Sequence, residues 1–191
     1  MNKVSLDDLM GTPAYEKVRD DFRRRIIELK QKRRISVGER VSLVFENRDT
    51  VIFQIQEMLR AEHITDLDKI REEIDVYNGL IPDANELSAT LFLEIEDQTH
   101  LRDELLKFLG IDEALFLQVG KHMIHAKFEE GRSKEDKISA VQYVRFAFSA
   151  EAISAFAGSD NAELKIDHPN YQARGPIAPA SRASLLADLT T

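Results

Sequence analysis

The sequence predicts an α+β fold, with a mainly antiparallel sheet and helices packed largely on one face of it. Residues 87–96 alternate between aliphatic and mostly polar side chains, which is typical of a strand with one buried face. Residues 41–46 alternate with the same period of two. Between such strands, apolar residues recur at the i, i+3, i+4, i+7 spacing of amphipathic helices. A sheet that carries such helices on one face belongs to the α+β class.

The first predicted helix spans residues 14–33. Thr12 is a suitable cap, and Pro13 fits the first helical position. The apolar stripe of this helix consists of Tyr15, Val18, Phe22, Ile26 and Leu29. Residues 35–38 end the helix and lead into the first strand.

The stretch 41–63 predicts a strand, a charged corner and a second helix. Val41, Leu43 and Phe45 share one face of the strand. Asp49 is the predicted N-cap, because its carboxylate can accept the free amide hydrogens of the first turn. The helix then covers residues 50–62 and buries a stripe at helical spacing.

The remaining elements follow in order. A helix over 66–76 starts after cap residues, carries Leu67, Ile70, Ile74 and Tyr77 inward, and is closed by Gly79 in the left-handed conformation. Strand 87–96 precedes a helix over 98–109 that stops at Gly110. Residues 114–128 alternate again, with a bulge or break at Gly120. A return strand over 138–148, an Ala-rich helix over 149–157 and an edge-like strand over 162–167 complete the set.

Residues 1–168 are expected to form a single α+β domain, and residues 169–191 an extended C-terminal tail. A chain of 191 residues favours one domain and can bury a proper core. From Pro169 onward, proline, glycine, alanine and serine dominate, which is typical of a segment that wraps the body or lies free. Leu185, Leu186 and Leu189 would form a helical turn or two and dock on a neighbouring subunit or a partner.

Composition excludes several classes of protein. The chain has no cysteine, so it forms no disulfide and holds no thiolate-bound iron–sulfur cluster. It contains no run of about 18 apolar residues, so no transmembrane helix is expected. Residues 1–8 lack the apolar core of a signal peptide, and the expected location is therefore the cytoplasm.

Charge is unevenly distributed along the chain. The formal net charge is −8, yet residues 16–40 carry a net charge of +5 and the remainder −13. A basic helix on an acidic body indicates docking on a protein partner or self-association to a homo-oligomer. Nucleic acid is a disfavoured partner, because acidic residues in the same helix compensate the charge and no recognised RNA or DNA motif is present.

The strand–helix corner holds the candidate site. The predicted ligand-binding residues at the corner are Glu46, Arg48, Asp49, Glu57 and Arg60, with Tyr77 and Asn78 at the rim. The alternative interpretation, which is favoured, is a set of ion pairs that fixes the helix on its sheet, with Tyr77 and Asn78 anchoring a loop.

Motifs for metals and cofactors are missing. His122 and His125 are three apart, but on a strand such residues face opposite ways. A metal site would need additional ligands, for which Glu57, Glu62, Glu94 and Glu96 are the candidates. There is no zinc signature, no G-x-G-x-x-G, no P-loop and no G-x-S-x-G. No metal or cofactor is therefore expected, and no catalytic residue can be assigned.

Several segments resemble a known bacterial family. Phe45-Glu-Asn-Arg-Asp-Thr50, Gln54-Ile-Gln-Glu-Met-Leu-Arg-Ala-Glu62, Val76-Tyr-Asn-Gly-Leu-Ile-Pro82, Glu86-Leu-Ser-Ala-Thr90 and Val141-Gln-Tyr-Val-Arg-Phe146 are similar to a domain of unknown function. Members of such families are often encoded beside rubrerythrin-like and iron–sulfur oxidoreductase proteins. The resemblance implies a soluble single-domain protein and supplies no catalytic residues.

Three hypotheses about function remain. The first and favoured one is an accessory or interaction protein associated with redox metabolism. The second is a small-ligand-binding protein or enzyme that uses the polar Arg/Glu corner. The third is a metal protein that uses histidine and glutamate ligands.

Overall fold

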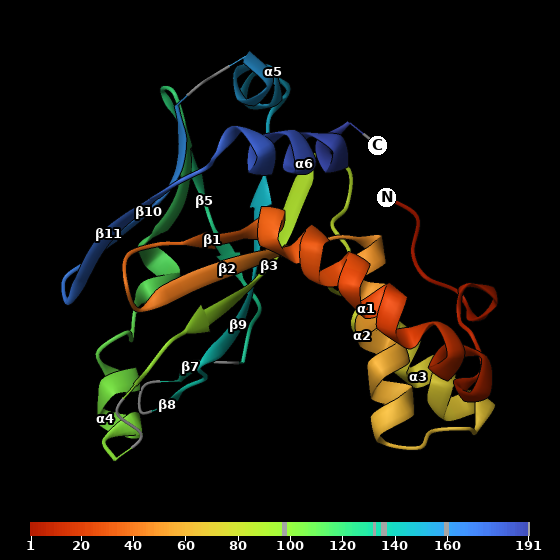
Figure 1. Cartoon of the computed structure of the whole chain (residues 1–191). Helices are drawn as coiled ribbons and strands as arrows, with labels where there is room; N and C mark the ends of the chain where they lie inside the picture. The colour runs from red at the N-terminus through yellow and green to blue at the C-terminus, as the bar shows by residue number, and fades with distance from the viewer. Residues whose placement is uncertain (97–98, 132, 135–136, 159–160, 191) are drawn as a thin grey trace.

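The structure is a computed structural model that describes residues 1–96, 99–131, 133–134, 137–158 and 161–190. Its helices are α1 (Thr12–Arg33), α2 (Arg48–Ala61), α3 (Leu67–Asn78), α4 (Leu101–Leu106), α5 (Ala150–Gly158) and α6 (Pro179–Leu189), with 3-10 turns at Leu6–Asp8 and Ile111–Glu113. Its strands are β1 (Arg34–Ser36), β2 (Val41–Glu46), β3 (Glu86–Leu93), β4 (Leu115–Val119), β5 (His122–His125), β6 (Lys127–Phe128), β7 (Ser133–Lys134), β8 (Lys137–Ile138), β9 (Val141–Ala147), β10 (Ala162–His168) and β11 (Tyr171–Pro176). The predicted α+β class is confirmed (Figure 1).

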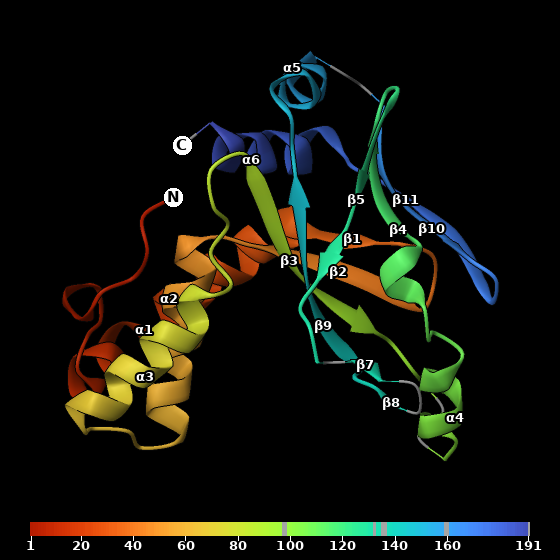
Figure 2. The same ribbon diagram turned by 180° about the vertical axis from the view of Figure 1, so that it is seen from behind.

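The strands form two main antiparallel sheets. One sheet has the order β1-β2-β3-β9-β6, and the other has the order β11-β10-β4-β5 (Figure 2). The predicted strand 114–128 is divided between the two, because Gly120 (φ 55°) makes the turn between β4 and β5 and the chain then crosses to β6. The sheets meet closely at β11, where a Cβ on Gly175 would lie 2.3 Å from the Ser36 carbonyl oxygen. Only glycine permits that approach.

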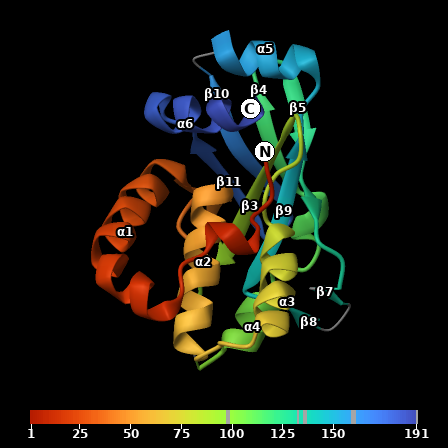
Figure 3. The same cartoon turned by 90° about the vertical axis from the view of Figure 1, so that its right-hand side faces the viewer.

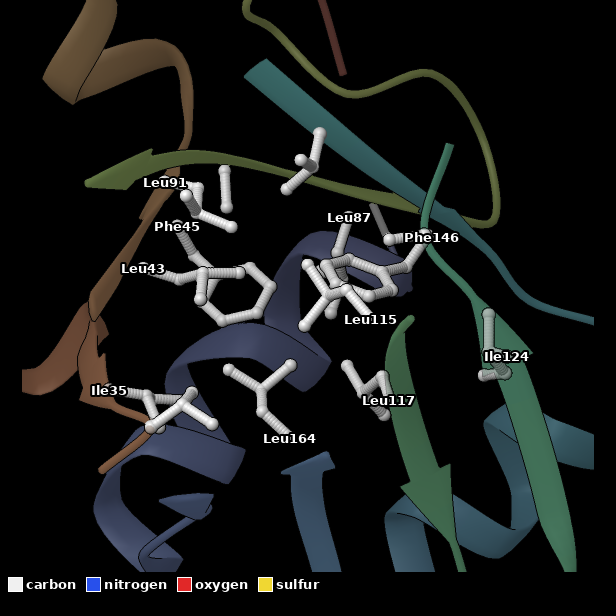
Figure 4. Packing of buried hydrophobic residues seen from close by; sticks show 14 of the residues in the cluster. Ile35, Leu43, Phe45, Leu87, Leu91, Leu115, Leu117, Ile124, Phe146 and Leu164 are labelled. Atoms are coloured by element: carbon white, nitrogen blue, oxygen red, sulfur yellow. The ribbon is translucent and has the colours of Figure 1, made fainter. Parts of the chain in front are cut away.

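The main core lies between the two sheets. Figure 4 shows Leu43 and Phe45 of the first sheet facing Leu117 and Leu164 of the second. Val41, Leu43 and Phe45 point into this core, as the period of two predicts. Removal of this apolar surface from water is the main favourable contribution to folding.

The helices divide into groups (Figures 1 and 3). α2 packs between α1 and α3 on one side of the sheets, around a smaller apolar cluster that includes Val51, Ile55 and Ile74. An edge-to-face aromatic contact between Phe22 and Phe53 joins α1 to α2, and Tyr15 packs edge-to-face on Phe22 within α1. α5 and α6 cover another side of the main core (Figure 1). No helix in the described ranges is long and apolar enough to cross a membrane.

Several local expectations need correction. Asn47, not Asp49, caps α2, since its side chain accepts the Thr50 amide at 3.0 Å and Asp49 lies exposed in the first turn. Gly79 after α3 has φ −59°, so the helix does not end in a left-handed glycine. Leu67, expected to face inward, is 54% exposed.

The segment after residue 168 is not an extended tail. β11 pairs with β10 along its whole length, so β10 lies inside its sheet between β11 and β4 and is not an edge strand. α6 follows, and its Leu185 and Leu189 are buried in the main core. The prolines at 176 and 179 mark the end of a strand and the first turn of a helix, both positions that proline tolerates.

Candidate functional site

The residues predicted for the corner site do not converge on one point. Glu46, at the end of β2, lies on the sheet. Arg48 forms an ion pair with Asp8 at 2.5 Å, on the N-terminal segment. Glu57 and Arg60 project from α2 towards α1, where Arg60 pairs with Glu16 at 3.1 Å. The side chains at the corner therefore extend to three different places: the sheet, the N-terminal segment and α1.

Glu57 links α2 to α1. Its Oε1 accepts hydrogen bonds from the Tyr15 hydroxyl and Arg19 Nε, both at 2.8 Å, and its Oε2 accepts one from Arg19 Nη2 at 2.7 Å. The hydrogen bonds from Arg19 are the main reason that the pKa of Glu57 is lowered, while burial raises the pKa of Tyr15. With both oxygens occupied, Glu57 has a positioning role between the helices.

This link predicts a pH-dependent stability. The pKa of Glu57 is lower in the folded than in the unfolded chain, so its contribution is complete above the unfolded pKa of about 4.3 and is lost as pH falls through the folded pKa. Wild type should therefore exceed Glu57→Gln in free energy of unfolding at pH 7, by a margin that shrinks towards pH 3. Urea denaturation at several pH values measures this margin. Glu72→Gln, on an exposed position of α3, is the matched control, and an equally pH-dependent margin for it would contradict the assignment.

The two rim residues hold chain segments in place. The Asn78 side chain accepts the Val4 amide at 2.8 Å and donates to the Val4 carbonyl at 2.9 Å. Tyr77 packs against the smaller apolar cluster, and burial raises its pKa. Nearby, hydrogen bonds from the Ser5 amide and from Arg48 lower the pKa of Asp8 to about 2. These contacts tie the N-terminal segment to α2 and α3.

Glu46 has a different setting, on the face of the first sheet that points away from the main core. The antiparallel register places Glu46 beside Ser88, and Ser88 beside Arg145. The next row on this face consists of Arg34, Val44, Thr90 and Tyr143. Four strands therefore contribute polar and aromatic side chains to one patch.

The Glu46 carboxylate is buried in this patch, with only 3% of the residue exposed. Its Oε2 accepts hydrogen bonds from the Thr50 hydroxyl at 2.5 Å and from Gln54 Nε2 at 3.0 Å. Its Oε1 accepts a hydrogen bond from the Thr90 hydroxyl at 2.7 Å. All three donors are neutral.

Two adjoining hollows open over this patch, with volumes of about 420 and 440 Å³. Glu46 and Tyr143 line both of them. The first hollow extends towards Arg145 and the loop after α3, and the second extends towards Phe92 and α1. We call the two hollows together the sheet groove, and it is the candidate functional site.

Most residues of the sheet groove were not predicted as site residues. Thr90 belongs to the strand 87–96, for which the sequence predicts alternation, and Tyr143 and Arg145 belong to the predicted return strand 138–148. A sequence signal for this face is the alternation of Ser88 and Thr90 with aliphatic residues in 87–96; in 141–147 the same parity places Tyr143 and Arg145 on one face.

The described part of the chain offers no evident metal centre. Among the described residues, no group of three or more histidines, aspartates and glutamates is placed to hold a metal ion. His122 and His125 lie in β5, where their positions differ in parity, and the His125 ring packs on Phe116 with centroids 4.9 Å apart. The described residues therefore contain no cluster of histidine and glutamate that would support a metal protein.

Comparisons with known proteins extend over nearly the whole chain. A family model described as "Protein of unknown function (DUF3501)" matches residues 3–189. The chain is also similar to the crystal structure of a novel protein of unknown function from Burkholderia pseudomallei, with 35% sequence identity and a TM-score of 0.91. That match covers 98% of this chain and 100% of the other. A search of curated proteins finds no match.

Proposed function

The chain belongs to the DUF3501 family of proteins of unknown function, and from the geometry of this member we propose that it is an accessory protein that binds a small molecule in the sheet groove. The observation that carries this proposal is the buried Glu46 carboxylate on the floor shared by two open hollows. A buried charge costs free energy unless it is compensated, so its place beneath an open groove favours a function in binding.

The dimensions and lining of the groove suit a small ligand. Ligand pockets commonly measure about 300–1,000 Å³ and combine apolar walls with a few polar groups that fix orientation. Here Phe92, Val44 and Val141 supply apolar wall, and Glu46 supplies the polar anchor. All four residues lie on strands, which hold side chains more firmly than loops do.

Two further parts of the proposal concern partners. A cytoplasmic role beside redox proteins rests on the resemblance alone. Docking or self-association through α1 is supported by its charge and by Val18 and Ile27, which are 42% and 43% exposed. A native pull-down from a bacterial lysate, together with native mass spectrometry, tests these parts. Recovery of the protein as a monomer without companions would count against both.

The groove itself is tested by a ligand screen that uses amide chemical shifts of ¹⁵N-labelled protein. Small molecules that bind are expected to shift the amides of Thr90, Tyr143 and Gln54, and to leave those of the exposed α3 residues Glu72 and Val76 unchanged. The α3 amides serve as an internal control for pH and non-specific effects. If a diverse set of several hundred compounds shifts no groove amide, the proposed function is wrong.

A further inference from the structure

We propose that the ligand of the sheet groove carries an organic cation, a protonated amine or a guanidinium, which forms an ion pair with Glu46. This inference rests on the proposed function and specifies the class of ligand. It starts from a missing countercharge: among the side chains that the structure describes, no lysine or arginine nitrogen lies within 4.0 Å of the Glu46 carboxylate.

Arg33, another deeply buried charged residue, gives an informative contrast. Arg33 is 1% exposed, and its guanidinium pairs with Asp188, which is itself nearly buried. The chain therefore supplies a countercharge for Arg33, whereas Glu46 receives only neutral donors. When an ionised carboxylate is removed from water, a cation within contact distance strongly stabilises it.

Glu46 borders the groove, so the groove is the side from which a ligand would approach its carboxylate. A carboxylate offers about four lone-pair positions, and three donors occupy part of this capacity. Thr50 and Gln54 approach from α2, and Thr90 approaches from β3. Glu46 lines both hollows, but the second also carries Lys30 and Arg34, so a cationic group is expected to approach Glu46 from the first hollow.

The charge around the first hollow also favours a cation. Its lining includes the carboxylates of Glu46, Asp83, Glu86, Glu129 and Glu130, against Lys127 and Arg145. Arg145 is already engaged, because it forms ion pairs with Glu86 and Asp83 and donates to the Gly79 carbonyl. Clefts lined by one sign of charge raise the local concentration of ligands of the opposite sign.

The aromatic and aliphatic side chains that line the groove indicate that the ligand also has an apolar part. Tyr143 borders both hollows, Phe128 borders the first and Phe92 the second. Aromatic faces attract organic cations, and they also cover an apolar stem. Ile27 of α1 adds aliphatic surface to the second hollow. The groove is therefore suited to an ammonium or guanidinium group on an apolar stem.

An inorganic cation fits less well. Ca²⁺ takes 6–8 oxygen ligands, and Mg²⁺ needs near-ideal octahedral coordination. The described residues contain no group of three or more acidic or histidine side chains placed around such an ion. One carboxylate with neutral neighbours suits a single organic cation, which brings its own hydrogen-bond donors.

The test compares three probes of similar shape and different charge: hexylammonium, 1-hexanol and hexanoate. Each is titrated into wild type, Glu46→Gln and Glu72→Gln at pH 7, and the groove amides are followed by NMR. Hexylammonium is expected to bind wild type and Glu72→Gln equally, and to bind Glu46→Gln at least about tenfold more weakly, since charge-assisted hydrogen bonds are roughly twice as strong as neutral ones. The other two probes should bind wild type at least about tenfold more weakly than hexylammonium does.

The outcomes separate this inference from the proposed function. If hexanol or hexanoate binds as tightly as hexylammonium, the proposed preference for a cation is wrong, but the groove still binds small molecules. Hexylammonium that binds Glu46→Gln as well as wild type overturns the role of Glu46. A complete lack of groove shifts with all three probes, and with the compound set above, removes the proposed function itself. The comparison of probes on wild type needs no variant, so it decides the charge preference even if Glu46→Gln does not fold.

Discussion

Arg33→Ala is expected to lower the free energy of unfolding by about 3–5 kcal/mol, because it breaks a buried ion pair and leaves an uncompensated charge. Arg33 joins the end of α1 to β2 and α6. Its Nε donates to the Phe45 carbonyl at 2.8 Å, and its Nη2 donates to the Glu46 carbonyl at 3.1 Å and to Asp188. Its Nη1 donates to the Ser184 hydroxyl at 3.1 Å. One side chain thus satisfies acceptors on two elements far apart in sequence.

Chemical denaturation of the purified variants measures this loss. Arg24→Ala is the matched control, since Arg24 pairs with Asp21 on the same helix but the two side chains are 70% and 84% exposed. Exposed pairs contribute about 0–1 kcal/mol, so this control should remain near wild type. Arg33→Lys should fall between the two, because lysine keeps the charge but lacks the guanidinium fork. Equal losses in Arg33→Ala and Arg24→Ala would show that the buried pair does not stabilise the fold.

The pKa of Asp188 adds a check on this assignment. Burial raises the pKa of its carboxyl, and the Arg33 guanidinium opposes that rise. Without Arg33, the carboxyl loses its cation and is expected to take up a proton more readily. The loss of stability in Arg33→Ala should therefore be larger at pH 7 than at a pH low enough to protonate Asp188.

The parts of the fold that follow from periodicity could be predicted from sequence. Alternation over 87–96 places Leu87 and Leu91 in the core and Thr90 on the opposite face, and the structure agrees. Such patterns report which side of an element is buried. They do not report which strands pair with each other, so they cannot predict the division into two sheets.

The candidate site shows the same boundary between local and long-range information. The sequence indicates Glu46 because this residue ends a strand at a charged corner. Its partner Thr90 is 44 positions away and reaches it only through the register of β2 and β3. Glu57 lies near Glu46 in sequence, yet it faces α1 from the helix and has no part in the groove. Proximity along the chain was therefore a poor guide to convergence.

Composition alone is a poor guide to residues 169–190, where a strand and a helix replace the expected tail. Proline, serine and alanine are typical of tails, but they also occur at strand ends and in short helices. Leu185 and Leu189 are four apart, which places them on one face of α6. That face is buried against the main core, so the segment belongs to the fold.

This reassignment gives the second large effect: Leu185→Ala should lower the free energy of unfolding by about 2–5 kcal/mol. Leu185 is 0% exposed, and a buried leucine that is cut to alanine loses transfer free energy and leaves a cavity. A tail that wraps loosely over the surface would predict a change within about 0.5 kcal/mol, as for surface substitutions in general. The measured value therefore distinguishes an integral α6 from a loosely attached one.

Leu186→Ala is the matched control, because Leu186 is the next residue on the same helix and is only partly buried. Both variants remove the same atoms and change helix propensity by the same amount, so the difference between them isolates burial. Urea denaturation should place Leu185→Ala well below Leu186→Ala, and both should unfold in a single transition. If instead α6 melts separately, circular dichroism of Leu185→Ala will show an early loss of helix while the sheets persist. That result would mean that α6 is attached to the core without being part of its cooperative unit, and that Arg33 loses its Asp188 partner before the sheets unfold.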